Sequence, residues 1–483
     1  PVPILSKFVD IVVNGIADRA FDLTAYSQDP YGVSKRTKYM ESIIRDLQTE
    51  ELNNFAQENF GINLFENNPD RLPDSEEELD LHMQLSYKQG IEIAEEEAIN
   101  VMFDENRYDL TKKRYYYDIT TLGIGAVKNN FTESEGVTVD YVDPAYLIYS
   151  YTEDPYFQDI YYAGEVKFVP LNELKKQFPD LSEDQLSQIQ QQGSQNYGVW
   201  NNNVSNGNNN RDQNIVQILY FNYKTYMNEV YKVKETATGA TKIIARDDQF
   251  DPPIEMYEEQ FGKMSRSLEV LYEGVMVLGT DIVLKWEMAK NMMRPKSDST
   301  KVKMNYAITA PRMYQGRIES IVSRCTAFAD MIQLTHLKLQ QVLQRMIPDG
   351  VYLDADGINE VDLGNGTNYN PQEALNMFFQ TGSIIGRSMT GDTATRHILD
   401  AGLYLTRETA ECLSLRISDI IEYHPAKEAF IQKIGGFNVA TLDEMRDLHL
   451  HDFGIFLELT PDDEQKQMLE NNVQQALSAG LID

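Results

Sequence analysis

Residues 312–346 read RMYQGRIESIVSRCTAFADMIQLTHLKLQQVLQRM and carry a helical period throughout. The apolar stripe steps by three or four residues through Ile318, Val322, Cys325, Ala329, Ile332, His336, Leu339, Leu343 and Met346. A helix of about 35 residues is about 52 Å long, whereas globular helices average about 10 to 14 residues. We therefore expect it to cross between subdomains or to lie against copies of itself. A single long core helix is the alternative, and His336 on the stripe is expected to be a satisfied core residue.

A basic island precedes this helix and overlaps its start. Between residues 285 and 317, eight Lys and Arg residues stand against Glu287 and Asp298, in a chain of formal net charge -32. We define the basic island by Lys296, Lys301, Lys303, Arg312 and Arg317. The two arginines are expected in the first helical turns, where positive charge opposes the helix macrodipole. The contrast with the acidic chain predicts contact with a polyanion, either DNA or an acidic protein partner.

Composition limits the class of protein. The 483 residues, 42% of them apolar, can form two to four domains with real cores. Two cysteines, Cys325 and Cys412, are too few to staple such a fold, which indicates a reducing compartment. No segment offers about 18 uninterrupted apolar residues, so we expect a soluble cytosolic protein without membrane contact. The chain begins Pro1-Val2-Pro3, without Met, as expected for a piece of a longer protein.

The order of local signals predicts an α+β fold. Ser75 and Glu78 form a capping box for an acidic helix over 74–105, whose charges are expected on a solvated face. Runs of β-branched and aromatic residues predict strands within 115–169 and at 215–223, 230–235, 268–278 and 282–286, the last two joined as a hairpin by Gly279-Thr280-Asp281. Short helices are expected within 170–179 and from Ser182, and an Asn/Gln-rich polar insertion follows at 187–214.

The C-terminal third reads as mostly helical after a turn-rich acidic segment that ends at Tyr369. Helices are expected from Asn370 to Gly382, over 397–423, from the Thr441/Glu444 capping box and over 460–480, with a strand at 454–459. The small polar residues 386–396 predict a flexible loop with Arg387 and Arg396 at its edges.

Catalytic signals are weak. No phosphate-binding Gly-rich loop, nucleophile elbow or zinc-spaced Cys pair is present in the sequence. Asp354, Asp356 and Asn359 lack the later Glu of a calcium loop. His449, His451 and Asp452 are the best metal candidates, because two histidines two apart on a strand share a face, but a third ligand in register is missing. We therefore expect a protein that is not an enzyme and has no metal or cofactor.

A family resemblance rests on three stretches. The helix of 312–346 leads into Gly350-Val351-Tyr352-Leu353-Asp354-Ala355-Asp356-Gly357; Val139-Asp140-Tyr141-Val142-Asp143-Pro144 lies in the sheet region; and Glu458-Leu459-Thr460-Pro461-Asp462-Asp463-Glu464 precedes a final helix ending Ala479-Gly480-Leu481-Ile482. Together they resemble the portal proteins of tailed double-stranded-DNA bacteriophages, most closely those of crAss-like phages. No single stretch is diagnostic of that family.

The resemblance implies a domain map. It comprises a wing over 1–311, a first stem helix over 312–346, a clip over 347–370, a second stem helix over 371–385, a tunnel loop over 386–396, and a C-terminal wing with the start of a crown over 397–483. The clip implied here is short, and a hairpin within 215–311 is the alternative clip. Clip residues facing partners would be Asp349, Asp354, Asp356, Glu360 and Asp362, and tunnel residues facing DNA would be Arg387, Ser388, Thr390, Thr393 and Arg396.

The resemblance also implies partners and a place in the virion. The chain would form a dodecameric ring at one capsid vertex, assembled in the host cytoplasm, that contacts the major capsid protein, the large terminase subunit, the tail adaptor and double-stranded DNA without sequence specificity. An acidic channel fits such a conduit, because a protein that grips about 6 to 10 phosphates changes its affinity for DNA by about 10³ to 10⁵ over modest salt changes. The alternatives are another collar or adaptor protein of the virion, or a metal-dependent hydrolase using His449, His451 and Asp452.

Overall fold

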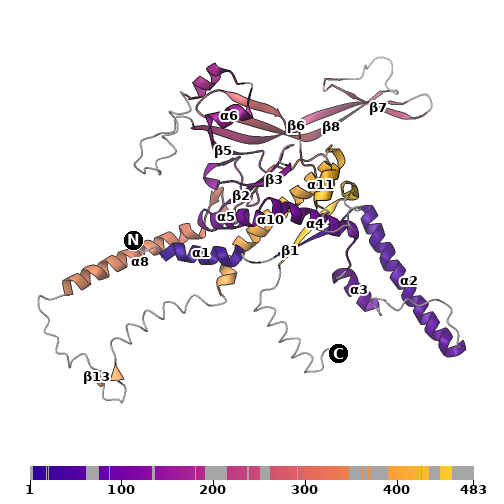
Figure 1. Ribbon diagram of the computed structural model, residues 1–483, viewed down its shortest axis with the longest axis horizontal. Coiled ribbons are helices and arrows are strands. Elements are labelled where there is room, and N and C mark those ends of the chain that lie inside the picture. The colour runs from indigo at the N-terminus through magenta and orange to yellow at the C-terminus, as the bar shows by residue number, and fades with distance from the viewer. Residues whose placement is uncertain are drawn as a thin grey trace.

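The chain folds as a mixed α+β structure in the computed structural model (Figure 1), which confirms the predicted class. The structure describes residues 4–17, 19, 21–60, 76–85, 87–132, 136–179, 181–190, 215–235, 239–247, 249–250, 261–290, 292–346, 361–362, 368–369, 390–425, 427–434 and 446–459. Within these ranges, no helix is long and apolar enough to cross a membrane.

Four helices contribute most of the main hydrophobic core. They are α1 (Ile4–Ala17), α4 (Gly90–Glu105), α5 (Tyr108–Thr121) and α10 (Thr390–Tyr423). α5 and α10 cross closely, because a Cβ atom on Gly402 would overlap the ring of Tyr116. Beside this crossing, the buried hydroxyl groups of Tyr115 and Thr406 are hydrogen-bonded at 2.9 Å. The core is therefore fixed by contacts between segments almost 300 positions apart in the sequence.

Two small sheets border the helical core. β2 (Gly125–Thr132) lies between β10 (Tyr306–Thr309) and β3 (Gly136–Tyr141), and all neighbours are antiparallel. β1 (Phe21–Ser27) pairs antiparallel with β15 (Phe453–Leu459), so the N-terminal and C-terminal regions meet in one ribbon. The predicted strand at 454–459 is confirmed as β15. Its partner strand, β1, was not predicted from the sequence.

A six-stranded antiparallel sheet forms a separate layer above the core (Figure 1). Its strands are β4 (Leu147–Tyr149), β5 (Tyr162–Pro170), β6 (Ile215–Glu235), β8 (Phe261–Val277) and β9 (Val283–Met288) in that order, with β7 (Thr241–Arg246) pairing to β6. One end of this sheet packs against α6 (Leu171–Gln177) through a cluster that includes Leu174 and Ile218. The far end of the β6, β7 and β8 ribbon projects from the body (Figure 1).

The remaining elements leave or link these layers. Figure 1 shows α8 extending from one side of the body and α2 with α3 from the other. Their bounds, with those of the short elements, are α2 (Pro30–Phe60), α3 (Glu76–Leu85), η1 (Pro144–Tyr146), β11 (Met313–Tyr314), β12 (Arg317–Ile318), α8 (Ile321–Met346), β13 (Val361–Asp362), β14 (Asn368–Tyr369), α11 (Lys427–Ile434) and η6 (Leu448–Leu450).

Several local predictions are confirmed. The helix within 170–179 is α6, and the hairpin around Gly279 joins β8 to β9. Ser182 and Gln185 cap the helical residues 183–190, since the backbone N–H of each donates a hydrogen bond to the side-chain oxygen of the other. The strands expected at 215–223 and 230–235 are one continuous strand, β6. Most of the insertion, from 191 to 214, lies outside the described residues, as do the helices expected over 371–385 and 460–480 and the Thr441/Glu444 capping box.

The expected helix over 312–346 begins nine residues late. β11 and β12 form a tight hairpin, and its two turn residues, Gln315 and Gly316, have φ values of 49° and 71°. Two-residue hairpins favour a turn with positive φ at both central residues, which glycine adopts readily. The helical spacing of apolar residues continues through this turn in the sequence, but the turn prevents a helix there. α8 therefore starts only at Ile321.

Three further predictions are wrong in their bounds. The acidic helix expected over 74–105 is split into α3 and α4, with a break before the N-cap residue Gln89. Residues 115–121, expected in the sheet, belong to α5, where Tyr115 and Tyr116 are buried. The predicted loop 386–396 is helical from Thr390 onward. Helix propagation is much easier than nucleation, so a buried helix that contains Ile398 extends through the preceding polar residues.

Candidate functional site

The base of α8 is fixed firmly to the body. Ser320 caps the helix, because its Oγ accepts the backbone N–H of Ser323 at 2.9 Å and its own N–H donates to Ser323 Oγ at 3.2 Å. Such a reciprocal cap satisfies amide groups that the first helical turn leaves unpaired. Ile321 and Val322 pack against the main core, where α8 contacts α1 and α5. The helix therefore leaves the body at a defined point.

Beyond this base, α8 is solvent-exposed along its length. Phe328 is 67% exposed and Leu339 is 56% exposed. Successive residues turn by 100° in a helix of 3.6 residues per turn, so the exposed side chains that share one face can be read from their spacing. This face, which we call the α8 stripe, is formed by Phe328, Met331, Ile332, Leu339 and Val342. No described element of the subunit covers it.

The described part of the structure does not support the alternative of a single long core helix. His336, predicted to be a satisfied core residue, is exposed, and its Nε2 lies 3.1 Å from the amide of Gln340 in the next turn. An amphipathic helix normally turns its apolar face to the core, and large exposed apolar patches on soluble proteins mark interaction sites. α8 is therefore a candidate interaction site, because no described element covers its apolar face beyond the base of the helix.

The segment after α8 holds the predicted clip and tunnel residues. Asp349, Asp354, Asp356, Glu360, Arg387 and Ser388 lie outside the described residues. Asp362 is in β13 and pairs with Asn368 of β14, in a two-stranded hairpin. Thr390, Thr393 and Arg396 belong to α10, not to a loop, and Arg396 forms an ion pair at 4.0 Å with Asp400 one turn later. The roles of these residues toward DNA or protein partners stay predictions.

Part of the basic island makes contacts within the subunit. Lys303 Nζ donates to Glu408 Oε1 at 3.0 Å and also to Glu411, both on α10. Lys296 Nζ donates to the backbone carbonyl of His449 at 3.0 Å and to that of His451. These two lysines therefore tie the segment between β9 and β10 to α10 and to the C-terminal ribbon.

The rest of the basic island is more open. Lys301 has a side chain that is 69% exposed and lies 3.8 Å from Asp298. Arg312 precedes β11 and Arg317 is the first residue of β12, so neither lies in the first turns of α8 as predicted, and the argument from an opposed macrodipole does not apply. Whether these three residues contact DNA or an acidic partner stays a prediction.

Three acids surround the contacts of Lys296 with the C-terminal ribbon, which we call the Lys296 junction. The charges of Glu95, which is buried, and of Asp419 and Asp452 all act on the Lys296 ammonium group. Glu95 is fully buried, and neither of its carboxylate oxygens has a hydrogen-bond partner among the described residues. Burial raises the pKa of Glu95 to about 7, against the opposing effects of Ser414 and Lys296. Burial likewise raises the pKa of Asp419 to about 6, opposed mainly by Arg416. This junction therefore holds titratable charge near neutral pH.

Two other acids of α4 accept hydrogen bonds from the ribbon formed by β1 and β15. Glu92 Oε1 accepts the backbone N–H of Ser27, and Glu96 Oε1 accepts that of Ala25, each at 2.9 Å. Arg36 and Lys88 neutralise these carboxylates at 2.6 and 2.8 Å. The expectation of a solvated acidic face is thus wrong for these residues. The sequence did contain a usable signal, because Gln89 and Glu92 have capping-box spacing and the Gln89 N–H donates to Glu92 Oε2 at 2.9 Å.

The histidine and aspartate candidates do not converge on a metal. His449 lies in η6, and its Nδ1 is 3.0 Å from the backbone carbonyl of Arg446. His451 Nδ1 is 3.0 Å from Asp29, an acid that caps α2 through the backbone N–H of Gly32 at 3.0 Å. Burial favours a raised pKa for Asp29, but hydrogen bonds from Ser27 and His451 hold it at about 2. Among the described residues, no group of three or more His, Cys, Asp or Glu is placed to hold a metal ion.

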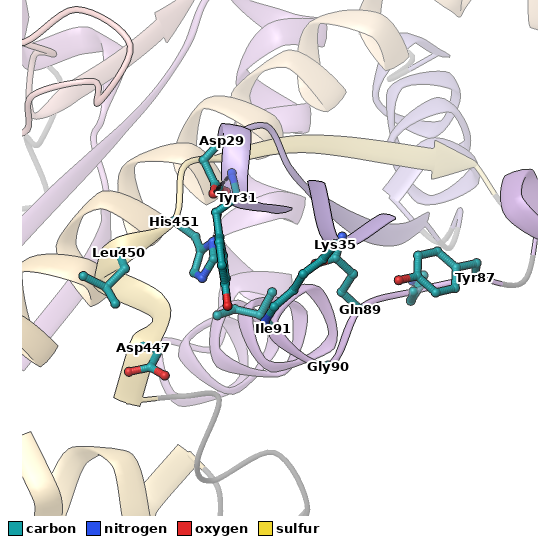
Figure 2. Close-up of a pocket in the computed structure, with 11 residues that line it drawn as sticks. Asp29, Tyr31, Lys35, Tyr87, Gln89, Gly90, Ile91, Asp447, Leu450 and His451 are labelled. Carbon is teal, nitrogen blue, oxygen red and sulfur yellow. Dashed lines mark hydrogen bonds and ion pairs between the residues drawn. The ribbon is translucent and has the colours of Figure 1, made fainter. Parts of the chain in front are cut away.

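A cleft of about 560 Å³ opens beside Asp29 and His451. Figure 2 shows Leu450 and His451 toward one end of this cleft and Tyr87 at the other, with Tyr31 and Gln89 between them. Asp29 and His451 are committed to each other and to the α2 cap. The cleft lies at a junction between α2, α4 and η6.

Comparison with known proteins adds no relative. No protein-family model matches the sequence, and no curated protein matches it. The functional conclusion therefore depends on the geometry and charge of this chain.

Proposed function

We propose that the chain is the portal subunit of a tailed double-stranded-DNA phage. Copies form a ring-shaped channel at one capsid vertex, through which the genome enters during packaging and leaves during ejection. The terminase and later the tail adaptor dock on the ring. The observation that carries this proposal is the α8 stripe, whose apolar residues have no covering element among the described part of the subunit.

Copies of the chain are the simplest cover for the α8 stripe. Helices packed side by side bury their apolar faces against each other and form a stiff wall. The covalent order also suits this role, because α8 leaves the body, the β13–β14 hairpin follows, and α10 returns into the main core. In a portal, these three parts correspond to a stem helix, a clip and the return to the wing.

The net negative charge of the chain is more consistent with a channel through which DNA passes than with a protein that binds DNA tightly. A formal net charge of -32 repels a phosphate backbone overall. Lys296 and Lys303, the most promising cations by sequence, are engaged within the subunit. A conduit needs contacts that are weak and without sequence preference, because each neutralised phosphate adds to salt-dependent affinity.

The first experiment tests the ring. Purified wild-type chain is examined by mass photometry and negative-stain electron microscopy, and we expect closed rings with a central hole. Leu339→Glu on the α8 stripe should weaken assembly by about tenfold or more, because burial of one Leu contributes about 1.5 to 3 kcal/mol. Gln341→Glu, two residues away and outside the α8 stripe, adds the same charge and should assemble normally.

The second experiment separates a portal from another collar protein. Antibody-labelled chain is located by electron microscopy on capsids that have packaged DNA but have not yet gained tails. A portal is expected at a single vertex of these tailless heads. Label found only on tailed particles would favour a collar or adaptor, and a monomer at all concentrations would reject both.

A further inference from the structure

The six-stranded sheet presents a continuous row of large apolar side chains on one face. Residues directly opposite each other on neighbouring strands point to the same face of a sheet, as do residues two apart on one strand. The register places these residues on the common face: Tyr162, Gly164, Phe221, Tyr223, Tyr272, Gly274, Trp286 and Met288. We call this surface the aromatic face.

The rings of the aromatic face pack on one another. Trp286 lies 5.6 Å from both Phe221 and Tyr272, and its ring is nearly parallel to that of Tyr272, at 22°. Phe221 covers Gly274, where a Cβ atom would overlap the phenyl ring. Glycine opposite an aromatic residue thus lets the ring lie flat on the sheet. The result is a smooth apolar layer in which Trp286 is still 52% exposed.

The two faces of these strands differ in charge and in cover. Glu273 and Lys285 alternate with the aromatic positions, so they lie on the opposite face, where they form an ion pair at 2.9 Å. That opposite face also contributes Leu271 and Val275 to core clusters within the subunit. None of the core clusters formed by the described residues includes Phe221, Tyr272 or Trp286.

We propose that the aromatic face is a contact surface for a second copy of this chain. The inference rests on the proposed ring, in which each subunit must offer two different surfaces to its two neighbours. The α8 stripe packs on the neighbouring stem helices, and the aromatic face is a further apolar surface in a different layer of the subunit. Copies that each carry a net charge of -32 repel one another, so close approach is easiest through a surface without charged side chains. Such a surface has no cation to neutralise a phosphate backbone, which disfavours DNA as the occupant.

The test uses Trp286 as a probe of its own burial. The chain has two tryptophans, so Trp200→Phe leaves Trp286 as the only one. Acrylamide quenching of Trp286 fluorescence is compared in the full-length ring and in the monomer obtained with Leu339→Glu. We expect quenching to fall by about threefold or more on assembly, because an interface core excludes solvent. Equal quenching in both states overturns the inference, and strong protection in the monomer overturns it too, because the chain itself would then cover the face.

A pair of substitutions tests the contact directly. Met288→Lys places a charge on the aromatic face and should raise the concentration needed for half-assembly by about tenfold or more. Ile243→Lys is the matched control, because Ile243 is an exposed apolar residue of β7 at the projecting end of the ribbon, opposite Val233 and ten positions along β6 from Tyr223. Rings that form equally well with Met288→Lys and wild type overturn this inference but leave the proposed function intact. A wild-type chain that stays monomeric overturns both.

Discussion

Glu92 of α4 accepts a hydrogen bond from the backbone N–H of Ser27 in β1, at 2.9 Å, and both residues are buried. Through this contact, an acidic residue that looks solvent-exposed in the sequence holds the outer edge of the ribbon between the two ends of the chain. The ribbon in turn positions His451 and Asp452 beside the Lys296 junction.

Loss of the Glu92 carboxylate should destabilise the subunit strongly. Glu92→Ala leaves Arg36 without its partner at 2.6 Å and leaves two backbone N–H groups unsatisfied. Breaking a buried ion pair on one side costs about 3 to 5 kcal/mol. We expect a loss of that order in the free energy of unfolding, measured by urea denaturation. Asn100→Ala, at an exposed site of the same helix, should change it by less than about 0.5 kcal/mol, and an equal effect of both would contradict the assignment.

Two helical glycines should respond to alanine with opposite signs. At Gly402 of α10, a Cβ atom would overlap the Tyr116 ring, so Gly402→Ala should destabilise the fold by about 1 to 3 kcal/mol. At Gly15 of α1, no atom lies within 4 Å of the added Cβ, so Gly15→Ala should stabilise it by about 0.5 to 1 kcal/mol. Thermal denaturation of both variants checks the signs. A stable Gly402→Ala variant would show that α5 and α10 do not cross closely.

Two neighbouring lysines of the basic island should also differ. Lys303 is mostly buried between Glu408 and Glu411, so Lys303→Ala removes the ion pair of Glu408, leaves Glu411 with Arg407, and should cost about 1 to 3 kcal/mol of unfolding free energy. Lys301 is exposed and should tolerate Lys301→Ala within about 0.5 kcal/mol. Urea denaturation measures both. If Lys301→Ala alone impaired assembly or DNA passage without changing stability, the surface role predicted for the exposed part of the island would be supported.

Glu95 should make the subunit less stable at alkaline pH. Its folded pKa, about 7, lies above the ordinary value of 4.5, so its protonated form is favoured in the folded state. This stabilising contribution is complete below about pH 4.5 and is lost as the pH rises through 7. The shift corresponds to at most about 3 kcal/mol between those limits.

The comparison with Glu95→Gln isolates this effect from other titrating groups. Glutamine stays neutral at every pH, so the variant should gain stability relative to wild type between about pH 4.5 and pH 7 and should keep that difference at higher pH. The free energy of unfolding of both proteins, measured across this range, gives the difference. A constant difference would show that Glu95 does not titrate near neutral pH in the folded chain.

The sequence predicted elements whose signals are local. α6, the β8–β9 hairpin and β15 follow from turn residues, caps and alternation within a few positions, and each is where it was expected. Errors occurred where a nearby or distant contact overrode the local pattern. The Gln315-Gly316 turn moves the start of α8 to Ile321. Tyr115 and Tyr116 have side chains that favour strands, but they lie in a helix because they are buried against α10.

For the candidate site, the sequence by itself determined that α8 is long and carries an apolar face, because that property depends only on spacing along one helix. The tertiary structure decided which faces and charges stay open. α8 is exposed because the described subunit brings no element to its stripe, and Lys303 is engaged because α10 places two acids beside it. The aromatic face exists because strand register aligns rings from four strands. These properties depend on contacts between residues far apart in the chain, which no local pattern encodes.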